Sequence, residues 1–211
     1  MHGRTAPTFP GVLQKMRYGF LIGLVLLLGL AAGCSDDDDG APAAAVAAFT
    51  GSATAAAPNG VRLEGTSVSN DVINVQVVLD GATTSADLYA FAFDILLSNP
   101  GVVNFIAGSA LFGDALETTP PQGELVLVSQ QGDRVIVAVS KTTQGVGNGF
   151  GAVERLILSL SFTVGSGSTT LTFVGSPLNP MNPTTEPTAL DSALNPIGTI
   201  TFDALSATIS R

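Results

Sequence analysis

The chain has 211 residues, of which 45 % are hydrophobic and only 12 % are charged, and it contains 24 glycines. This composition predicts a globular domain rich in strands and excludes a coiled coil. After Cys34 the chain carries five basic and seventeen acidic residues, a balance of −12, without any cluster of Lys or Arg. So acidic a chain repels phosphate backbones, and we therefore expect no nucleic acid partner.

The residue types that are missing after Cys34 exclude several kinds of chemistry. No His, Trp or second Cys follows it, and Tyr89 is the only Tyr there. Nucleophilic catalysis by Ser-His-Asp or Cys-His is therefore excluded, as are zinc sites built from His or Cys. Paired carboxylates could hydrolyse glycosides, but no motif marks a pair among Asp94, Asp114, Glu117, Asp133 and Glu154. We predict that the protein is not an enzyme and uses no cofactor or metal ion.

The N-terminal segment has the layout of a secretory signal peptide. An apolar run of 11 residues (20–30) follows the basic residues Lys15 and Arg17 and precedes three small residues. The run is too short to span a bilayer, which takes about 20 apolar residues. We predict that residues 1–33 are a signal peptide, with Met16 as an alternative start.

The signal peptide ends in L-A-A-G-C (residues 30–34), which resembles the lipobox of bacterial lipoproteins. The resemblance implies that diacylglycerol is attached to the sulfur of Cys34 and that the chain is cleaved just before it. Acyl chains anchor a protein stably because each buried CH₂ contributes about 0.8 kcal/mol. We expect the protein to be anchored to the membrane of the cell envelope through Cys34, at the outer membrane or cell surface rather than the inner membrane.

Residues 34–60 are predicted to form a flexible tether. Four consecutive aspartates (36–39) resemble part of a calcium loop, but alignment of Gly40 with the EF-hand glycine places Val46 where a bidentate Glu is required. The rest of the segment consists mainly of Ala, Gly, Ser, Thr and Pro, without a periodic apolar pattern. The sequence therefore predicts a solvated spacer and a folded domain over residues 61–211.

From Val61 onward, apolar and polar residues alternate with the period of a β-strand. In residues 88–93 the aromatic residues share one face and the aliphatic residues share the other. About nine strands are predicted, over residues 61–64, 72–79, 88–93, 102–107, 125–129, 134–140, 156–164, 169–174 and 200–209. A long irregular loop with five prolines is expected over residues 177–196. The pattern predicts an all-β fold, a β-sandwich of two sheets.

The order of these elements is similar to that of the cohesin family, nine-stranded jelly-roll modules related to cellulose-binding domains. Three stretches carry the resemblance: L-Y-A-F-A-F-D-I-L-L-S-N-P-G-V-V-N-F (88–105), G-S-A-L-F (108–112) and V-I-V-A-V-S-K-T-T-Q-G-V-G-N-G-F-G-A-V-E-R-L-I-L-S-L-S-F-T-V (135–164). Together with the strands between and around them, they cover essentially the whole predicted domain.

The resemblance implies a non-catalytic binding or scaffolding module. Its partner would be a dockerin, a small calcium-loaded protein module borne by polysaccharide-degrading enzymes, which binds a flat sheet face. On the third predicted strand this face comprises Leu88, Ala90, Ala92 and Asp94. Two alternatives stay open: a carbohydrate-binding module or other component of a polysaccharide-degradation system, and a structural lipoprotein of the envelope.

Overall fold

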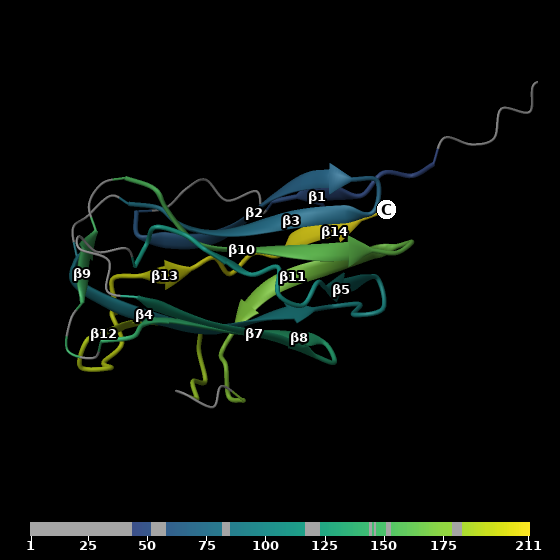
Figure 1. The fold of residues 1–211 in the computed structure, drawn as a ribbon. Coiled ribbons are helices and arrows are strands. Elements are labelled where there is room, and N and C mark those ends of the chain that lie inside the picture. Colours follow the sequence, from purple (N-terminus) through teal and green to yellow (C-terminus); the bar gives the residue numbers. More distant parts are fainter. Residues whose placement is uncertain are drawn as a thin grey trace, which may run out of the picture. The chain divides into compact units, whose positions relative to one another are not determined.

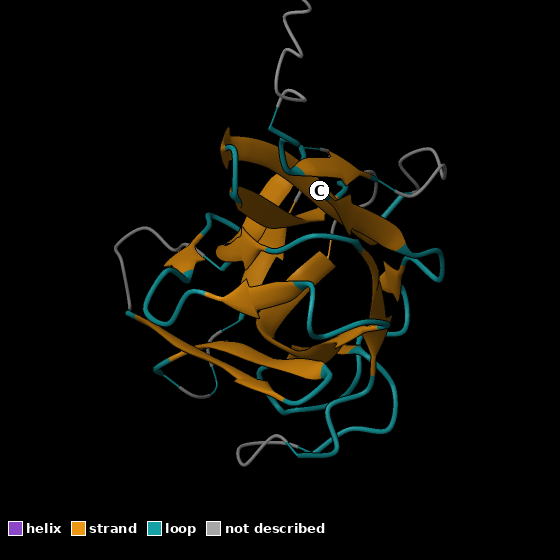
Figure 2. Ribbon diagram, turned by 90° about the vertical axis from the view of Figure 1, so that its right-hand side faces the viewer, coloured by secondary structure: helices purple, strands orange, loops and turns teal. Residues whose placement is uncertain are grey.

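The computed structural model describes residues 44–51, 58–81, 85–116, 123–143, 145, 147–150, 153–178 and 183–211. The chain divides into two units, Met1–Ala41 and Pro42–Arg211. The predicted signal peptide, Cys34 and the aspartate run all lie outside the described residues. Among the described residues, none belongs to a helix, so no helix there is long and apolar enough to cross a membrane (Figure 2).

In the described part of the chain, fourteen strands form two sheets (Figure 1). The eight-stranded sheet has the order β1-β14-β11-β4-β8-β7, and β9 and β12 also pair with β4. Its strands are β1 (Ala48–Thr50), β4 (Ser85–Leu97), β7 (Glu124–Gln131), β8 (Arg134–Lys141), β9 (Asn148–Phe150), β11 (Ser168–Val174), β12 (Thr188–Asp191) and β14 (Ala207–Ser210).

The six-stranded sheet has the order β13-β2-β3-β10-β5, with β6 also paired to β10. Its strands are β2 (Gly60–Ser69), β3 (Val72–Leu79), β5 (Val103–Phe105), β6 (Leu111–Phe112), β10 (Arg155–Val164) and β13 (Thr201–Phe202). All pairings are antiparallel except that of β13 with β2. The predicted all-β sandwich of two sheets is confirmed. Several strands of two to four residues were not predicted, because so short a segment cannot show a period of two.

The core lies between the two sheets and is filled by alternate residues of the longest strands. On β10, Leu158, Leu160 and Phe162 are fully buried, and on β8 the side chains of Val135 and Val137 are as well. A fully buried aliphatic or aromatic side chain of this size stabilises the fold by about 1.5–3 kcal/mol relative to an exposed one. The alternation read from the sequence therefore identifies which face of these strands is buried.

Strand β4 departs from strict alternation at Tyr89. Leu190 of β12 pairs with Ala90, whereas the next residue of β12 pairs with Leu88, so the register skips Tyr89. Because of this shift, Leu88 joins the main core beside Phe91, while Tyr89 packs in a separate cluster with Ala90 and Leu190. The predicted division of residues 88–93 into an aromatic and an aliphatic face is therefore wrong at its first two positions.

The folded domain also begins earlier than residue 61. Strand β1 pairs with β14 in the register Phe49 to Ile209, and Ala47 is buried. The Phe49 ring lies directly on Gly65 of β2, where a Cβ atom would overlap it. The segment around Phe49 thus belongs to the sandwich, which shortens the predicted tether at its C-terminal end.

Candidate binding face

The outer faces of the two sheets differ in chemistry. On the six-stranded sheet, the residues that alternate with the core positions of β3 and β10 are mostly polar. Asn74 pairs with Ser161 across these strands, and its Nδ2 donates to Ser161 Oγ over 3.4 Å. Gln76 stands opposite Ser159 in the same strand register. This face has the composition of a surface that stays in contact with water.

The outer face of the eight-stranded sheet is apolar beside its free edge at β7. Leu127 pairs with Ala138 of β8, which pairs with Ala92 of β4. One row further along, Leu125 and Ala90 flank Ser140. Leu125 and Leu127 are 44 % and 38 % exposed, because Val126 and Val128 are the β7 residues that pack against the core. We call Ala90, Ala92, Leu125, Leu127 and Ala138 the apolar face.

An ion pair with a buried carboxylate lies on the same side of the sheet, next to the apolar face. Asp94 is fully buried, and its Oδ2 accepts a hydrogen bond from Arg134 Nη1 at 3.1 Å. Its Oδ1 accepts one from the hydroxyl of Ser176. Arg134 Nη1 also donates to the carbonyl oxygen of Gly175 at 3.3 Å. These bonds hold the segment that follows β11 against β4 and β8.

That segment, of which residues 175–178 and 183–187 are described, leaves the sheet between two strands that share one edge of β4. Strand β11 pairs with β4 as far as Asp94, and β12 resumes the pairing at Ala92. The base of this segment is closed by Ser176 and Thr184, which exchange two hydrogen bonds of 3.0 Å. Its described ends run away from the lower layer of Figure 1, on the side opposite the core. The irregular loop predicted over 177–196 is therefore interrupted by β12.

The four side chains predicted for the binding face are not exposed. Leu88 lies in the main core, on the opposite side of the sheet from the other three. Ala90, Ala92 and Asp94 do point to the outer side, but each is at most 6 % exposed. Their role in binding therefore stays a prediction. The leucines of β7 were overlooked, although L-V-L-V (125–128) gives a signal: apolar residues at consecutive positions leave one face of an edge strand apolar.

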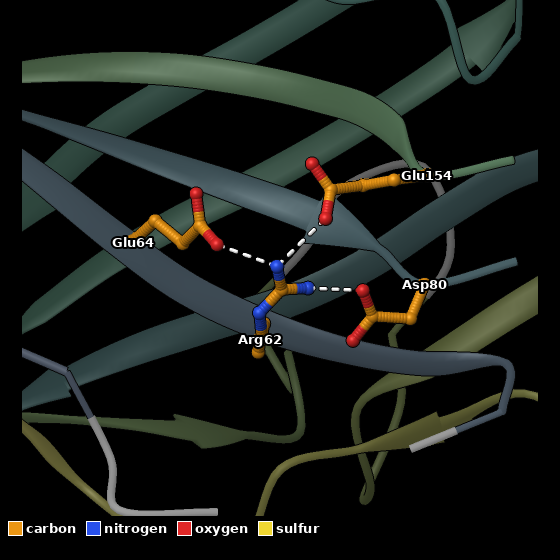
Figure 3. A network of polar contacts seen from close by, with 4 residues as sticks. All are labelled: Arg62, Glu64, Asp80 and Glu154. Carbon is orange, nitrogen blue, oxygen red and sulfur yellow. Dashed lines mark hydrogen bonds and ion pairs between the residues drawn. The ribbon is translucent and has the colours of Figure 1, made fainter. Parts of the chain in front are cut away.

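Of the five basic residues after Cys34, the four arginines make contacts within the domain and Lys141 is buried. Arg62, on the outer face of the six-stranded sheet, contacts the carboxylates of Glu64, Asp80 and Glu154 (Figure 3). Burial raises the pKa of Asp80, although the charge of Arg62 opposes this effect. Asp80 Oδ2 is buried and has no hydrogen-bond partner among the described residues. This cluster fixes the ends of β2 and β3 to the residue that precedes β10.

The other three arginines are engaged in the same internal way, and Lys141 is buried without a hydrogen-bond partner for its amine among the described residues. Arg134 pairs with Asp94, and Arg155 pairs with Asp114 at 3.0 Å. Arg211 donates to two backbone carbonyl oxygens, at 3.1 and 3.0 Å. Lys141 is only 2 % exposed, and burial lowers the pKa of its amine. The surface of the domain therefore offers carboxylates rather than uncommitted cations to a partner.

The described residues hold no group of three or more His, Cys, Asp or Glu side chains that could bind a metal ion. Some of the acidic residues of the described surface are tied to arginines, hydroxyls or backbone N–H groups, as Asp87 is to Ser192.

No family model matches the sequence, and no curated protein matches it. Among solved structures, a type II cohesin domain from the cellulosome of Acetivibrio cellulolyticus is 8 % identical, with a TM-score of 0.49 and coverage of 72 % of this chain and 92 % of that chain. The similar structures are cohesins. A type II cohesin from a cohesin–X-dockerin complex of the same organism is 13 % identical, with a TM-score of 0.48 and coverage of 69 % and 93 %. A non-cellulosomal cohesin from the archaeon Archaeoglobus fulgidus is 16 % identical, with a TM-score of 0.39 and coverage of 77 % and 88 %.

Proposed function

We propose that the chain is a lipid-anchored, non-catalytic module of a bacterial cell envelope that binds a protein partner through the apolar face. One observation carries the proposal: Leu125 and Leu127 are exposed on an edge strand, next to alanines on the two neighbouring strands. Burying such a patch on association is favourable because it removes apolar surface from water. On the outer face of the other sheet, the exposed Leu111 stands opposite a serine, Ser159, rather than beside further apolar residues.

The partner is a small protein module with an apolar centre and basic residues around it. The charge balance of −12 after Cys34 and the internal pairing of the arginines favour a cationic partner, because complementary charge steers association. A dockerin is our specific choice, since the sequence resembles the cohesins. A polysaccharide is less favoured. The chain has no Trp, and Tyr89, the only Tyr after Cys34, is buried, so no Trp or Tyr ring of the domain is available for a sugar to stack on.

The anchor is proposed to be diacylglycerol on Cys34, as the lipobox-like sequence implies. Substitution of Cys34→Ser would leave the protein unlipidated and in the soluble fraction. Labelled fatty acid and membrane fractionation test this, and label on the C34S protein would refute it. An outer-membrane or surface location is proposed as well, and protease treatment of intact cells tests which side of the membrane carries the domain.

The binding proposal is tested with the detergent-purified full chain and calcium-loaded dockerin modules encoded by the same genome. Leu127→Lys places a charge in the apolar face, and the matched control is Leu111→Lys, an exposed leucine on the outer side of the six-stranded sheet. We expect L127K to weaken dockerin binding at least about tenfold and L111K to leave it unchanged. Equal binding by both variants would reject the apolar face, and retention on insoluble polysaccharide without any dockerin binding would favour the carbohydrate alternative.

A further inference from the structure

The chain from Ala189 to Ile197 forms a tight hairpin at the end of β12. Ile197 N–H donates to the Ala189 carbonyl oxygen at 2.8 Å, and Asp191 N–H donates to the Asn195 carbonyl oxygen at 2.9 Å. The loop between them has three residues, and the last, Leu194, has a φ of 67°. The third residue of such a loop commonly adopts this left-handed conformation, which suits glycine.

Leucine is an unfavourable residue at this position for two separate reasons. Its Cβ atom makes the left-handed conformation strained, whereas glycine avoids the strain and asparagine tolerates the conformation well. Besides Leu194, the only non-glycine residue with a positive φ in the described part of the chain is Asn59. In addition, the Leu194 side chain is 45 % exposed, so much of it remains in water.

Two aspartates hold the loop in this conformation. Asp191 Oδ1 accepts hydrogen bonds from the N–H groups of Ala193 and Asn195, at 2.9 and 2.8 Å. On the other side, Asp87 Oδ2 accepts one from Ser192 Oγ at 2.7 Å. The leucine is therefore presented by a loop that is fixed on both sides. A pre-organised side chain loses little conformational entropy when a partner binds it.

We propose that Leu194 is a contact residue that inserts into an apolar pocket of the protein partner, beside basic groups that face Asp87 and Asp191. This inference rests on the proposed function, because the hairpin grows out of β12, whose Leu190 packs on Ala90 of the apolar face. Because both aspartates carry negative charge, the residues around the partner's pocket are expected to be basic. The strain at Leu194 is kept because the side chain is needed at the interface.

The test compares substitutions at Leu194 in the detergent-purified full chain, with the calcium-loaded dockerin as the probe. Leu194→Gly and Leu194→Asn remove the side chain but suit the left-handed backbone, so both variants should fold. We expect each to weaken dockerin binding at least about tenfold. Leu194→Met, which keeps an apolar side chain, should bind within a few-fold of the wild type. Using both Gly and Asn separates loss of the side chain from a gain in loop flexibility.

Leu205 provides a matched control, because it is 53 % exposed and its N–H also donates to an aspartate, Asp203. Leu205→Gly should leave the affinity unchanged. If L194G and L194N bind as the wild type does while L127K does not, the assignment of Leu194 is overturned and the apolar face stands. If the wild type itself binds no dockerin, the proposed function in this form fails, and the assignment of Leu194 falls with it.

Discussion

Arg134 Nη1 lies 3.1 Å from Asp94 Oδ2, so a fully buried carboxylate is paired with a guanidinium that is 30 % exposed. Removing one partner of such a pair is costly because the other charge stays buried without compensation. We expect Arg134→Met to lower the free energy of unfolding by about 3–5 kcal/mol. Chemical denaturation, followed by the loss of strand signal, measures this change.

Arg155→Met is the matched control for that prediction. Arg155 and Asp114 lie at a similar distance, 3.0 Å, but their side chains are 38 % and 42 % exposed. A pair so accessible to water contributes no more than about 1 kcal/mol. Combining R134M with Asp94→Asn should recover part of the lost stability, because the buried charge is then removed. Equal losses for R134M and R155M would contradict the role given to burial.

Lys141 should lower the stability of the domain. Its amine is buried and has no hydrogen-bond partner among the described residues, and an unsatisfied buried charge costs at least about 1–3 kcal/mol. We therefore expect Lys141→Met, which keeps the length of the side chain, to raise the free energy of unfolding by that amount at neutral pH. Leu125→Met, on the neighbouring edge strand, is a control that leaves the charge balance unchanged.

The Lys141 effect should also depend on pH. Burial lowers the pKa of the folded amine below its usual 10.5, so the unfolded chain binds more protons between the folded pKa and 10.5. The stability of the wild type relative to K141M should therefore rise with pH across this interval. The difference between the two proteins would be largest below the folded pKa and smallest above 10.5. A constant difference over the whole range would refute the assignment to this amine.

Asp80 should give a pH dependence of the opposite sign. Burial raises its folded pKa above the usual 3.8, so the folded chain binds more protons than the unfolded chain in the interval above 3.8. The contribution of Asp80 to stability should therefore fall as pH rises through this interval. Asp80→Asn, which cannot titrate, should flatten the profile there, and Glu154→Gln, at a mostly exposed partner of the same arginine, serves as the control. An unchanged slope in D80N would reject this account.

The long strands could be predicted from sequence because each has a repeating pattern and a single buried face. Strand β10 shows this best, since its leucines alternate with serines from Leu158 to Phe162. The shift at Tyr89 could not be predicted, because a register shift is set by the partner strand rather than by local alternation. The four residues predicted for the binding face lie on the eight-stranded sheet but are buried, and their role in binding stays a prediction. The burial of Asp94 could not be predicted, because its partner Arg134 lies 40 positions further along the chain.

Strand β1 was missed for a related reason, and its importance can be tested directly. Three residues, Ala48–Thr50, cannot show alternation, and the preceding alanines resemble a linker. The ring of Phe49 packs on Gly65 of β2, while its backbone pairs with Ile209 of β14, so it connects the two sheets. We expect Phe49→Ala to lower the free energy of unfolding by about 2–4 kcal/mol, a little less than a deeply buried Phe, because the ring is only partly buried.

Val46 and Gly65 supply the comparisons for that experiment. Val46 is exposed and lies three residues before Phe49, so Val46→Ala should change the stability by less than about 0.5 kcal/mol. Gly65→Ala should destabilise the domain as well, because the new Cβ atom would overlap the Phe49 ring. The effects of F49A and G65A should not add, since once the ring is gone the Cβ atom has space. Full additivity of the two, or a loss in F49A no larger than in V46A, would mean that β1 is not part of the folded domain and that the tether extends to residue 60.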